Sequence, residues 1–260
     1  MRRYRTRPVP GFRSGEDRLS PCDRWHVWSP FATYNPLVPD AELSRGSFGE
    51  LTLATFVERL ASGEPVPGGG SASAVAAALG AGLVAMVASL SQGRPKYAGH
   101  TDLHARAIET GRRLSARFLE LADDDSNAYA TFAETLKLPR ETDVEKDRRR
   151  AAMAAAARDA AEVPLAVAEA CLELVATAEA LVGRSNANAS SDLNVSALLA
   201  EAAARGAVEN VLVNLPTVND DAYQTETTSR AMKLLDNIEE IAAVVHEGVK
   251  TGAARDPISA

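Results

Sequence analysis

The feature of this sequence that most constrains its fold is a run from Ala72 to Leu90, which contains no charged residue and is mostly Ala, Gly, Ser and Val. Side chains this small let neighbouring helices approach closely. The run is long enough to cross a membrane. Ala, Ser and Gly gain little from lipid, however, so we predict a central buried helix and no membrane contact.

The turn before this helix, Pro-Val-Pro-Gly-Gly-Gly-Ser at residues 65–71, is a candidate binding site. Consecutive glycines leave the backbone free to adopt positive φ and let another group come close. We expect Ser71 at the N-cap, where its hydroxyl would accept a hydrogen bond from a first-turn N–H. Unpaired N–H groups and the positive end of the helix dipole suit a carboxylate or phosphate. The alternative is a tight turn that only starts a buried helix.

Composition narrows the possible functions. The net charge is −7, which argues against nucleic acid as a partner, because phosphate contacts need clustered Lys and Arg. Hydrophobic residues make up 46% of the chain but aromatic ones only 5%, so the core is expected to consist of Ala, Leu and Val. Cys22 and Cys171 form neither a disulfide framework nor a zinc site, which makes a reducing cytoplasm the expected location.

Helical periodicity dominates the chain after an irregular or disordered, proline- and arginine-containing N-terminal extension, residues 1–50. We predict one helical domain over residues 51–260, an all-α bundle of five to six long antiparallel helices. The expected helices lie at about 51–60, 72–90, 101–136, 142–182, 193–215 and 221–250, with a capping box at Thr142 and Glu145, a kink at Pro164 and a break at Pro216.

Three adjacent acids, Asp123, Asp124 and Asp125, fall in the middle of the helix expected over 101–136. Asp125 follows Leu121 by four positions and therefore shares its apolar stripe, Asp124 lies near that stripe, and Asp123 lies toward the other edge. Desolvation on an apolar stripe would raise the pKa of a carboxyl, as a general acid requires. The alternative is a solvated acidic face.

Two groups of polar side chains could contact a ligand. Asn186, Ser191 and Asp192 belong to a loop whose amides and hydroxyls suit a heterocycle edge, although Ser191 or Asp192 could simply cap the next helix. Asn210 and Asn214 lie four apart on an apolar helix, where they would clamp a neighbouring helix or face a ligand.

Histidine spacing offers a weak metal signal. His100 and His104 are four residues apart, the spacing of a two-histidine site, but no third ligand accompanies them. We interpret both as surface residues and predict no metal site.

The order and spacing of several short motifs carry a family resemblance. The motifs are Phe56-Val57-Glu58, residues 65–74, Gly93-Arg-Pro-Lys-Tyr97, Asp123-Asp-Asp125 with Ala128-Tyr129, Lys137-Leu-Pro139, Val163-Pro-Leu165, residues 186–192, Asn210 to Leu215, and Asp220-Asp221. Together they resemble the cyclodeaminase/cyclohydrolase family, which is the C-terminal half of the bifunctional formiminotransferase-cyclodeaminase and also occurs as a free-standing bacterial protein. The resemblance covers about residues 51–250.

The resemblance implies an all-helical homodimer or larger assembly that uses a tetrahydrofolate derivative as substrate, with no metal or redox cofactor. The implied reaction releases ammonia from 5-formiminotetrahydrofolate and forms 5,10-methenyltetrahydrofolate. The implied catalytic acid is Asp123 or Asp125, and the sequence leaves both open. The candidate substrate-binding residues are Pro67, Gly68, Gly69, Gly70, Ser71, Lys96, Asn186, Ser191, Asp192, Asn210 and Asn214.

The sequence is also compatible with other functions. Some free-standing members of the family instead hydrolyse the methenyl compound to 10-formyltetrahydrofolate, and a non-catalytic folate-binding protein or a purely structural bundle would use the same fold. One departure from the family concerns Ser185, which stands where the loop usually has glycine. If that glycine supplied positive φ, Ser185 would be strained or the loop reshaped.

Overall fold

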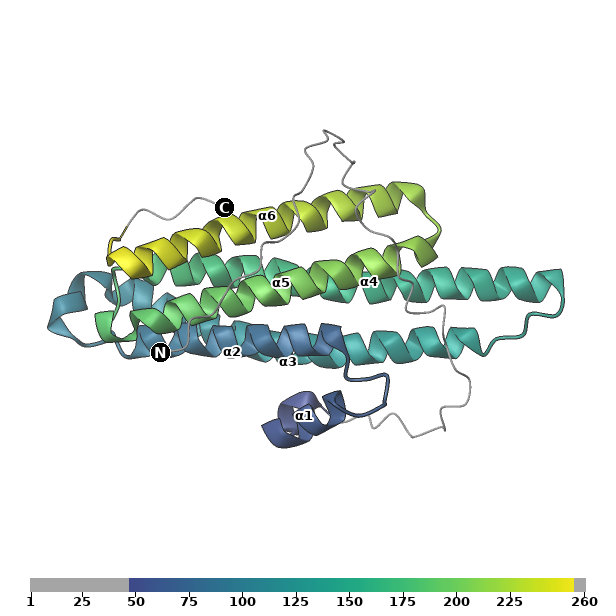
Figure 1. Cartoon of the computed structure of the whole chain (residues 1–260), viewed down its shortest axis with the longest axis horizontal. Helices are drawn as coiled ribbons and strands as arrows, with labels where there is room; N and C mark the ends of the chain where they lie inside the picture. Colours follow the sequence, from purple (N-terminus) through teal and green to yellow (C-terminus); the bar gives the residue numbers. More distant parts are fainter. Residues whose placement is uncertain (1–46, 255–260) are drawn as a thin grey trace, which may run out of the picture. The chain divides into compact units, whose positions relative to one another are not determined.

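The computed structural model describes residues 47–254, which form six α-helices and no β-strand (Figure 1). The helices are α1 (Leu53–Leu60), α2 (Gly69–Ser89), α3 (Thr101–Leu136), α4 (Asp143–Leu181), α5 (Ser190–Val218) and α6 (Asp221–Thr251). Short 3-10 helices are η3 (Phe48–Glu50), η4 (Pro95–His100) and η5 (Ala187–Ala189). The all-α prediction is confirmed, with five long helices and one short one. The predicted irregular extension lies outside the described residues except for residues 47–50.

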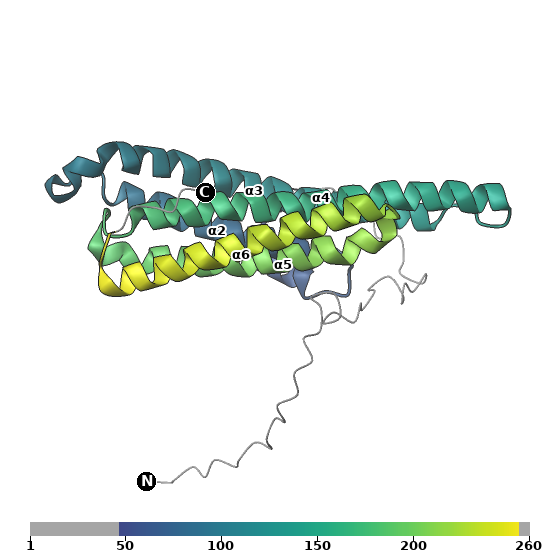
Figure 2. The ribbon, with the colours of Figure 1, turned by 90° about the horizontal axis from the view of Figure 1, so that it is seen from above.

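The long helices lie side by side, and each runs antiparallel to the next in the chain (Figures 1 and 2). α2 packs against both α3 and α5, and α4 packs against α3, α5 and α6. Buried Ala, Leu and Val residues fill the contacts between these helices, as the composition predicted. Core packing therefore depends on small side chains that bring helix backbones close together.

Two predicted helix starts and ends are confirmed in detail. α3 spans Thr101–Leu136, the range expected from periodicity. α4 begins with a complete capping box, in which the Glu145 N–H donates to Thr142 Oγ1 (3.2 Å) and the Thr142 N–H donates to Glu145 Oε2 (2.9 Å). Pro164 lies inside α4, which continues to Leu181.

Three expected helix boundaries are wrong. Ser71 is not an N-cap, because α2 begins two residues earlier and Gly68 occupies the cap without a side-chain bond. Neither Ser191 nor Asp192 caps α5, because the N-cap residue is Ala189, which makes no side-chain hydrogen bond. Pro216 lies in the last turn of α5 rather than after it. Proline removes one N–H donor there, and the helix ends two residues later at an Asn219 in the left-handed conformation (φ 55°).

The buried-helix prediction for α2 holds for one side of the helix. Among the described residues α2 is the one helix long and apolar enough to cross a membrane, and 56% of its most apolar window is buried inside the bundle. Exposed positions on its other side include Leu79 and Met86. α2 therefore has an uncharged outer face as well as a buried one.

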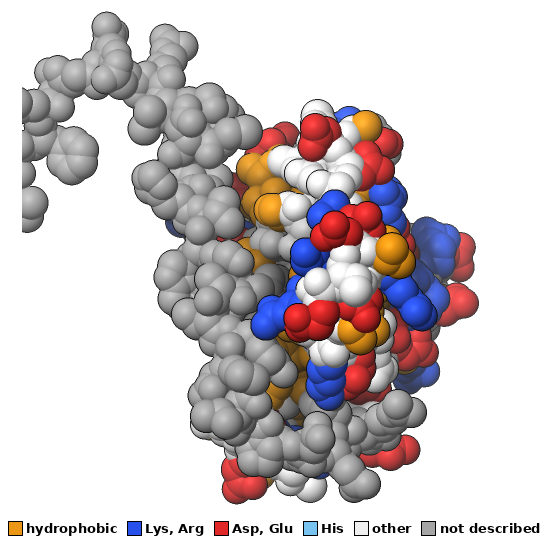
Figure 3. All heavy atoms as spheres, turned by 90° about the vertical axis from the view of Figure 1, so that its right-hand side faces the viewer, with side chains coloured by type: hydrophobic (Ala, Val, Ile, Leu, Met, Phe, Trp, Pro, Cys, Tyr) orange, Lys and Arg blue, Asp and Glu red, His pale blue; other side chains and the backbone are white. Residues whose placement is uncertain are grey.

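Charged side chains of both signs gather at the end of the bundle where α3 turns into α4 (Figure 3). Exposed ion pairs there join Lys137 to Glu134, Lys146 to Asp143 and Arg150 to Asp147. Exposed pairs of this kind contribute little stability. We therefore interpret this end as a solvated surface, and the three ion pairs add no net charge to it.

Candidate functional site

The beginning of α2 meets Asp125 of α3. Ser71 Oγ lies 2.9 Å from Asp125 Oδ2, to which it donates, and 3.1 Å from the Ala122 carbonyl oxygen. The backbone of Gly70 touches the same carboxyl so closely that a Cβ at this position would lie 2.1 Å from Asp125 Oδ1. A larger residue there would force the Asp125 carboxyl or the start of α2 to move, so the central glycine of the turn allows the close approach to Asp125. We call Gly68–Ser71 with Asp125 the glycine end.

Burial raises the pKa of Asp125 above the usual carboxyl range, while hydrogen bonds from the Ser71 hydroxyl and backbone oppose this effect. The sequence expectation of a desolvated carboxyl on the apolar stripe is therefore confirmed for Asp125. A half-buried carboxyl that holds its proton at higher pH than usual has the property required of a general acid.

The other two acids of the triplet have different surroundings. Asp123 Oδ1 accepts a hydrogen bond of 2.7 Å from the Phe48 N–H and so attaches η3 to α3. The side chain of Asp124 is 47% exposed and lies 3.7 Å from an Arg117 guanidinium nitrogen. Neither of these two carboxyl groups packs against the first turn of α2 as Asp125 does. The structure thus separates three neighbours that the sequence left nearly equivalent.

Asn210 and Asn214 lie on the part of α5 that runs past the glycine end. A Cβ on Gly69 would be 3.9 Å from Asn210 Nδ2, so Asn210 borders the turn. Asn210 Nδ2 donates to the Gly206 carbonyl of its own helix, whereas Asn214 Nδ2 donates to the Ala160 carbonyl of α4 (2.8 Å each). Asn214 therefore clamps a neighbouring helix, one of the two roles expected for it.

The loop before α5 is fixed by side chains from other elements. The Asn186 N–H donates to Ser91 Oγ (2.8 Å), and the Ala187 N–H donates to the Tyr97 hydroxyl (3.0 Å). His104 Nε2 lies 2.9 Å from the Arg184 carbonyl oxygen. Ser91, Tyr97 and His104 are buried. We call the loop and these three contacts the loop end.

The remaining predicted substrate contacts lie at or beside the loop end. Lys96 is exposed, with its Nζ 5.4 Å from the centre of the Tyr97 ring. Ser191 is exposed and Asp192 is half-buried in the first turn of α5. Pro67, by contrast, is buried in the turn at the glycine end.

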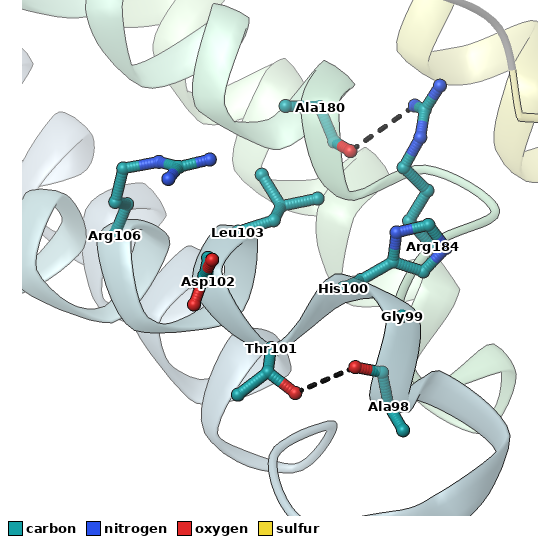
Figure 4. A pocket seen from close by; sticks show the side chains of 9 residues that line it. All are labelled: Ala98, Gly99, His100, Thr101, Asp102, Leu103, Arg106, Ala180 and Arg184. Atoms are coloured by element: carbon teal, nitrogen blue, oxygen red, sulfur yellow. Dashed lines mark hydrogen bonds between the residues drawn. The ribbon is translucent and has the colours of Figure 1, made fainter.

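A cavity of about 530 Å³ opens beside the loop end (Figure 4). Its charged and titratable lining consists of His100, Asp102, Arg106 and Arg184, and Arg184 Nη1 donates to the Ala180 carbonyl (3.4 Å). The cavity is lined by none of the predicted substrate contacts, but it adds two guanidinium groups to the same end as Lys96.

The predicted site residues therefore fall into two groups at opposite ends of α2. α2 has 21 residues, which at about 1.5 Å per residue span about 30 Å. The glycine end lies at the start of α2, and Lys96 and the contacts of Asn186 lie beyond its other end. The described chain does not bring all the predicted substrate contacts into one pocket.

Several residues with roles at these ends were missed from the sequence. Ser91 and Tyr97 hold the loop, and nothing in their local pattern pointed to partners so distant in the chain. His104 was interpreted as a surface residue and is 1% exposed, so that interpretation is wrong. Its position on the buried side of α3, three residues before the buried Ala107, was the available signal.

The departure at Ser185 causes no backbone strain. Among the described residues other than glycine, only Asn219 has positive φ. The left-handed position in this loop is Gly183 (φ 69°), where a Cβ would lie 2.6 Å from the Ala254 backbone nitrogen. Ser185 is buried, and its hydroxyl donates to the Leu181 carbonyl (2.9 Å). The strain considered for Ser185 is therefore wrong, because the glycine that the loop needs stands two residues earlier.

The residues that the structure describes contain no cluster of metal-binding side chains and no exposed thiol. No group of three or more His, Cys, Asp or Glu side chains there could hold a metal ion. Cys171 is fully buried in α4, and burial raises the pKa of its thiol. The expectation of no metal or redox cofactor stays a prediction.

These features define an all-helical bundle with a small-residue central helix, a glycine turn against a buried acid, and an amide loop. A sequence profile described as formiminotransferase-cyclodeaminase matches residues 52–233, and the chain belongs to this family. The resemblance inferred from the motifs is confirmed.

Named relatives fall into two groups. The mouse formimidoyltransferase-cyclodeaminase is 36% identical over 90% of this chain, which spans 42% of that relative's length; for the pig protein the identity is also 36% and the spanned share is 38%. A methenyltetrahydrofolate cyclohydrolase of Methylorubrum extorquens is 34% identical over 78% of this chain and 98% of its own. A crystal structure titled formiminotetrahydrofolate cyclodeaminase from Thermotoga maritima superposes with a TM-score of 0.71 at 24% identity, covering 78% of this chain and 98% of that one, and this likeness supports the fold.

Proposed function

We propose that this protein is a formimidoyltetrahydrofolate cyclodeaminase that converts 5-formiminotetrahydrofolate to 5,10-methenyltetrahydrofolate and ammonia. The observation that carries the proposal is Asp125, a half-buried carboxyl of raised pKa held between Ser71 and the backbone of Gly70. Membership of the formiminotransferase-cyclodeaminase family supports the folate substrate.

Ring closure needs a proton at the departing nitrogen. N10 of the folate attacks the formimino carbon, and the imino nitrogen must gain two protons before the carbon–nitrogen bond breaks and ammonia leaves. One is the proton that N10 loses, and Asp125 in its acid form supplies the other, which leaves the methenyl product as a cation. When Asp125 is protonated, its O–H can donate to Ser71 Oγ while Ser71 donates to the Ala122 carbonyl, so Ser71 can serve both charge states of the acid.

Asp123 is the second candidate for the acid. Its carboxylate accepts a hydrogen bond of 2.7 Å from the Phe48 N–H and so fixes a structural segment, η3, to α3. We therefore assign the acid role to Asp125 and a positioning role to Asp123.

A methenyltetrahydrofolate cyclohydrolase is the second candidate function. The M. extorquens relative of that name matches this chain over nearly its whole length, whereas the bifunctional relatives are matched over less than half of theirs. The same acid would then act with water as the nucleophile, and the methenyl ring would open to 10-formyltetrahydrofolate.

The rest of the functional proposal follows the family. We expect a tetrahydrofolate derivative as the bound molecule, a homodimer or higher homo-oligomer as the assembly, no metal or redox cofactor, and a cytoplasmic location. Lys96 would meet the folate carboxylates, and Arg106 and Arg184 line the cavity beside the loop end.

The methenyl chromophore provides the test. Absorbance that rises when purified protein meets 5-formiminotetrahydrofolate, with one ammonia released per chromophore, is the result we expect. Loss of absorbance from 5,10-methenyltetrahydrofolate, with no reaction of the formimino compound, would establish the cyclohydrolase instead. Folate binding without either reaction would overturn both enzymatic assignments.

A further inference from the structure

The hydroxyl of Ser126 lies next to the proposed acid without bonding to it. Ser126 follows Asp125 on α3, and its Oγ lies 3.2 Å from Ser71 Oγ in the first turn of α2. Among the described residues, the side-chain hydrogen bond to the Asp125 carboxyl comes from Ser71 and not from Ser126. Any effect of Ser126 on the acid therefore acts through Ser71.

The Ser71 oxygen has several hydrogen-bond partners and a single proton to share among them. Asp125 Oδ2 lies at 2.9 Å, the Ala122 carbonyl oxygen at 3.1 Å and Ser126 Oγ at 3.2 Å. A serine hydroxyl donates one hydrogen bond and accepts two. Ser71 and Ala122 are fully buried, so the choice among these partners is made within the protein.

Ser126 is the donor toward Ser71 in both charge states of the acid. An ionised Asp125 only accepts, so the Ser71 proton points to Oδ2 and the Ser126 proton points to Ser71. A protonated Asp125 donates to Ser71, whose own proton then points to the Ala122 carbonyl. Ser126 donates in that state to the second lone pair of Ser71. If Ser71 instead donated to Ser126, an ionised Asp125 would lose the hydroxyl that bonds to it.

The Ser126 hydroxyl favours the ionised state of the acid over the protonated one. In the ionised state the bonds from Ser126 to Ser71 and from Ser71 to Asp125 run in one direction, and each bond polarises and strengthens the next. In the protonated state two donors converge on the same Ser71 oxygen, so neither bond strengthens the other. Ser126 therefore stabilises the carboxylate that remains after Asp125 has given up its proton.

We propose that Ser126 is a positioning residue for Asp125, because its hydroxyl keeps the Ser71 hydroxyl directed at the carboxylate that proton transfer leaves behind. The catalytic part of this inference rests on the proposed function, whereas the hydrogen-bond part does not. Ser126 does not touch the reacting atoms; it acts through Ser71 on the charge state of the acid.

The surroundings of Asp125 leave this effect undisturbed. Burial raises the pKa of Asp125, and hydrogen bonds from the Ser71 hydroxyl and backbone are the opposing causes. α2 contains no charged residue, and the α5 side chain that borders the turn is the neutral amide of Asn210. The neighbouring acids on α3, Asp123 and Asp124, have partners of their own. A change in the Ser71 bond therefore reaches the pKa of Asp125 directly.

The titration of Asp125 in folate-free protein tests the hydrogen-bond chain. In protein labelled with ¹³C-aspartate, the carboxyl signal of Asp125 is the one missing from Asp125→Asn. Ser126→Ala should raise the pKa of Asp125, because the Ser71 bond to the carboxylate loses its polarising donor. The same change made in Ser71→Ala protein should leave the titration where Ser71→Ala alone puts it. An unshifted titration in Ser126→Ala, or an equal shift in both backgrounds, would overturn the proposal.

Ser73→Ala is the matched control in the same turn of α2. The Ser73 hydroxyl donates to the Gly69 carbonyl of its own helix (2.8 Å) and takes no part in the chain that leads to Asp125. We expect the Asp125 titration to stay in its wild-type position in this variant. A shift as large as that of Ser126→Ala would show that any hydroxyl lost from this end acts alike, against a specific role for Ser126.

The pH profile of kcat tests the catalytic part. An acid of higher pKa gives up its proton less readily, so kcat of Ser126→Ala at low pH should fall about two- to fivefold, with KM unchanged. The limb on which kcat falls with rising pH should lie at higher pH than in wild type, because Asp125 stays protonated longer. A fall by the same factor at every pH, with the limb unmoved, would indicate structural damage alone and would refute the positioning role.

The two readouts separate this inference from the proposed function, since the titration needs no folate. If Ser126→Ala shifts the titration through Ser71 but wild type leaves both folate substrates unchanged, the proposed function fails and the hydrogen-bond chain stands. If wild type turns over folate and Ser126→Ala titrates like wild type, the proposed function stands and the role of Ser126 is refuted.

Discussion

The glycine end and the loop end of α2 are built in different ways. At the glycine end the backbone of Gly70 presses against one carboxyl, and burial raises the pKa of Asp125. At the loop end buried hydroxyl and imidazole groups hold backbone N–H and C=O groups, and the exposed charges of Lys96 and Arg106 are positive. The glycine end therefore holds one titrating carboxyl, whereas the loop end holds a fixed backbone and several charged side chains, of which Lys96, Arg106 and Arg184 are cations and Asp102 is an anion.

This difference suggests a division between chemistry and binding. A single titrating group acts best where water is excluded and its protonation state is set by burial. Anionic substrate groups are held best by cations that stay partly solvated, because full burial of those charges would cost too much. Variants at the glycine end should therefore change kcat most strongly, and variants at the loop end should change KM or loop stability.

The largest effect is expected for Asp125→Asn. It removes the proposed proton donor but keeps the shape of the side chain, so kcat should fall about 10²- to 10⁴-fold with little change in folate binding. Steady-state assays with isothermal titration of the folate would measure both quantities. Asp124→Asn, whose side chain is 47% exposed, is the matched control and should stay near wild type. Equal losses in both variants would remove the distinction between the two ends.

The pH dependence sharpens the same prediction. An acid catalyst works while protonated, so kcat should fall as pH rises through the raised pKa of Asp125, and this limb should be absent from the residual activity of Asp125→Asn. The raised pKa of Asp125 also determines how the stability of the fold changes with pH. Since the folded state binds the Asp125 proton more tightly than the unfolded state, this carboxyl destabilises the fold above its folded pKa and not below its unfolded one. Asp125→Asn should therefore raise the melting temperature near neutral pH and lose this advantage in acid.

Gly70→Ala is expected to have the next largest effect. The added methyl would overlap Asp125 Oδ1, so the acid or the start of α2 must move, at a cost of about 1–3 kcal/mol. Urea unfolding and kcat should both report the change. Gly69→Ala is the control one residue earlier, because its new methyl would meet its nearest neighbour at 3.9 Å. If the two variants were equally stable, the close approach of Gly70 to Asp125 would be disproved.

Ser91→Ala tests the loop end and should act more weakly. It leaves the buried Asn186 N–H without its acceptor, which costs about 1 kcal/mol and loosens the loop. We expect faster hydrogen exchange at Asn186 and a raised KM, with kcat nearly unchanged. Ser89→Ala removes a hydroxyl that bonds only within α2, at the Ala85 carbonyl, and serves as the control. A large fall in kcat for Ser91→Ala would contradict the division between the ends.

Ser185→Gly should have the smallest effect. It restores the residue usual in the family but removes the bond to the Leu181 carbonyl, so we expect a loss of roughly 0.5–1 kcal/mol and activity within about twofold of wild type. Thermal unfolding and the two folate assays would measure these changes. A marked gain in either reaction would show that Ser185 limits the loop, contrary to its unstrained backbone.

Local patterns in the sequence predicted local structure well. Periodicity gave the bounds of α3, and the capping box at Thr142 gave the start of α4. Helical phase also identified Asp125 as the desolvated member of its triplet, because burial on a helix repeats with the helix turn. Errors occurred at helix ends such as Ser71, where contact with a neighbouring helix outweighs the intrinsic preference for a cap.

Long-range contacts could not be read from the sequence. The Phe48 N–H reaches Asp123, and the Ala187 N–H reaches Tyr97, across long stretches of chain with no local signal. The division of the candidate site into two ends was missed for the same reason. Family motifs indicate which residues belong to one candidate site, but they do not predict the distances between those residues in the folded chain.

The number of residues in α2 has a consequence of its own. Each residue added to an α-helix moves everything beyond it by about 1.5 Å and turns it through about 100°. One insertion in α2 would swing Ser91 away from Asn186 while leaving the Gly70 contact with Asp125 in place. Substitutions on its exposed face alter a surface, whereas insertions or deletions alter the phase between two distant sets of contacts. The helix is thus more tolerant of new side chains than of a new length.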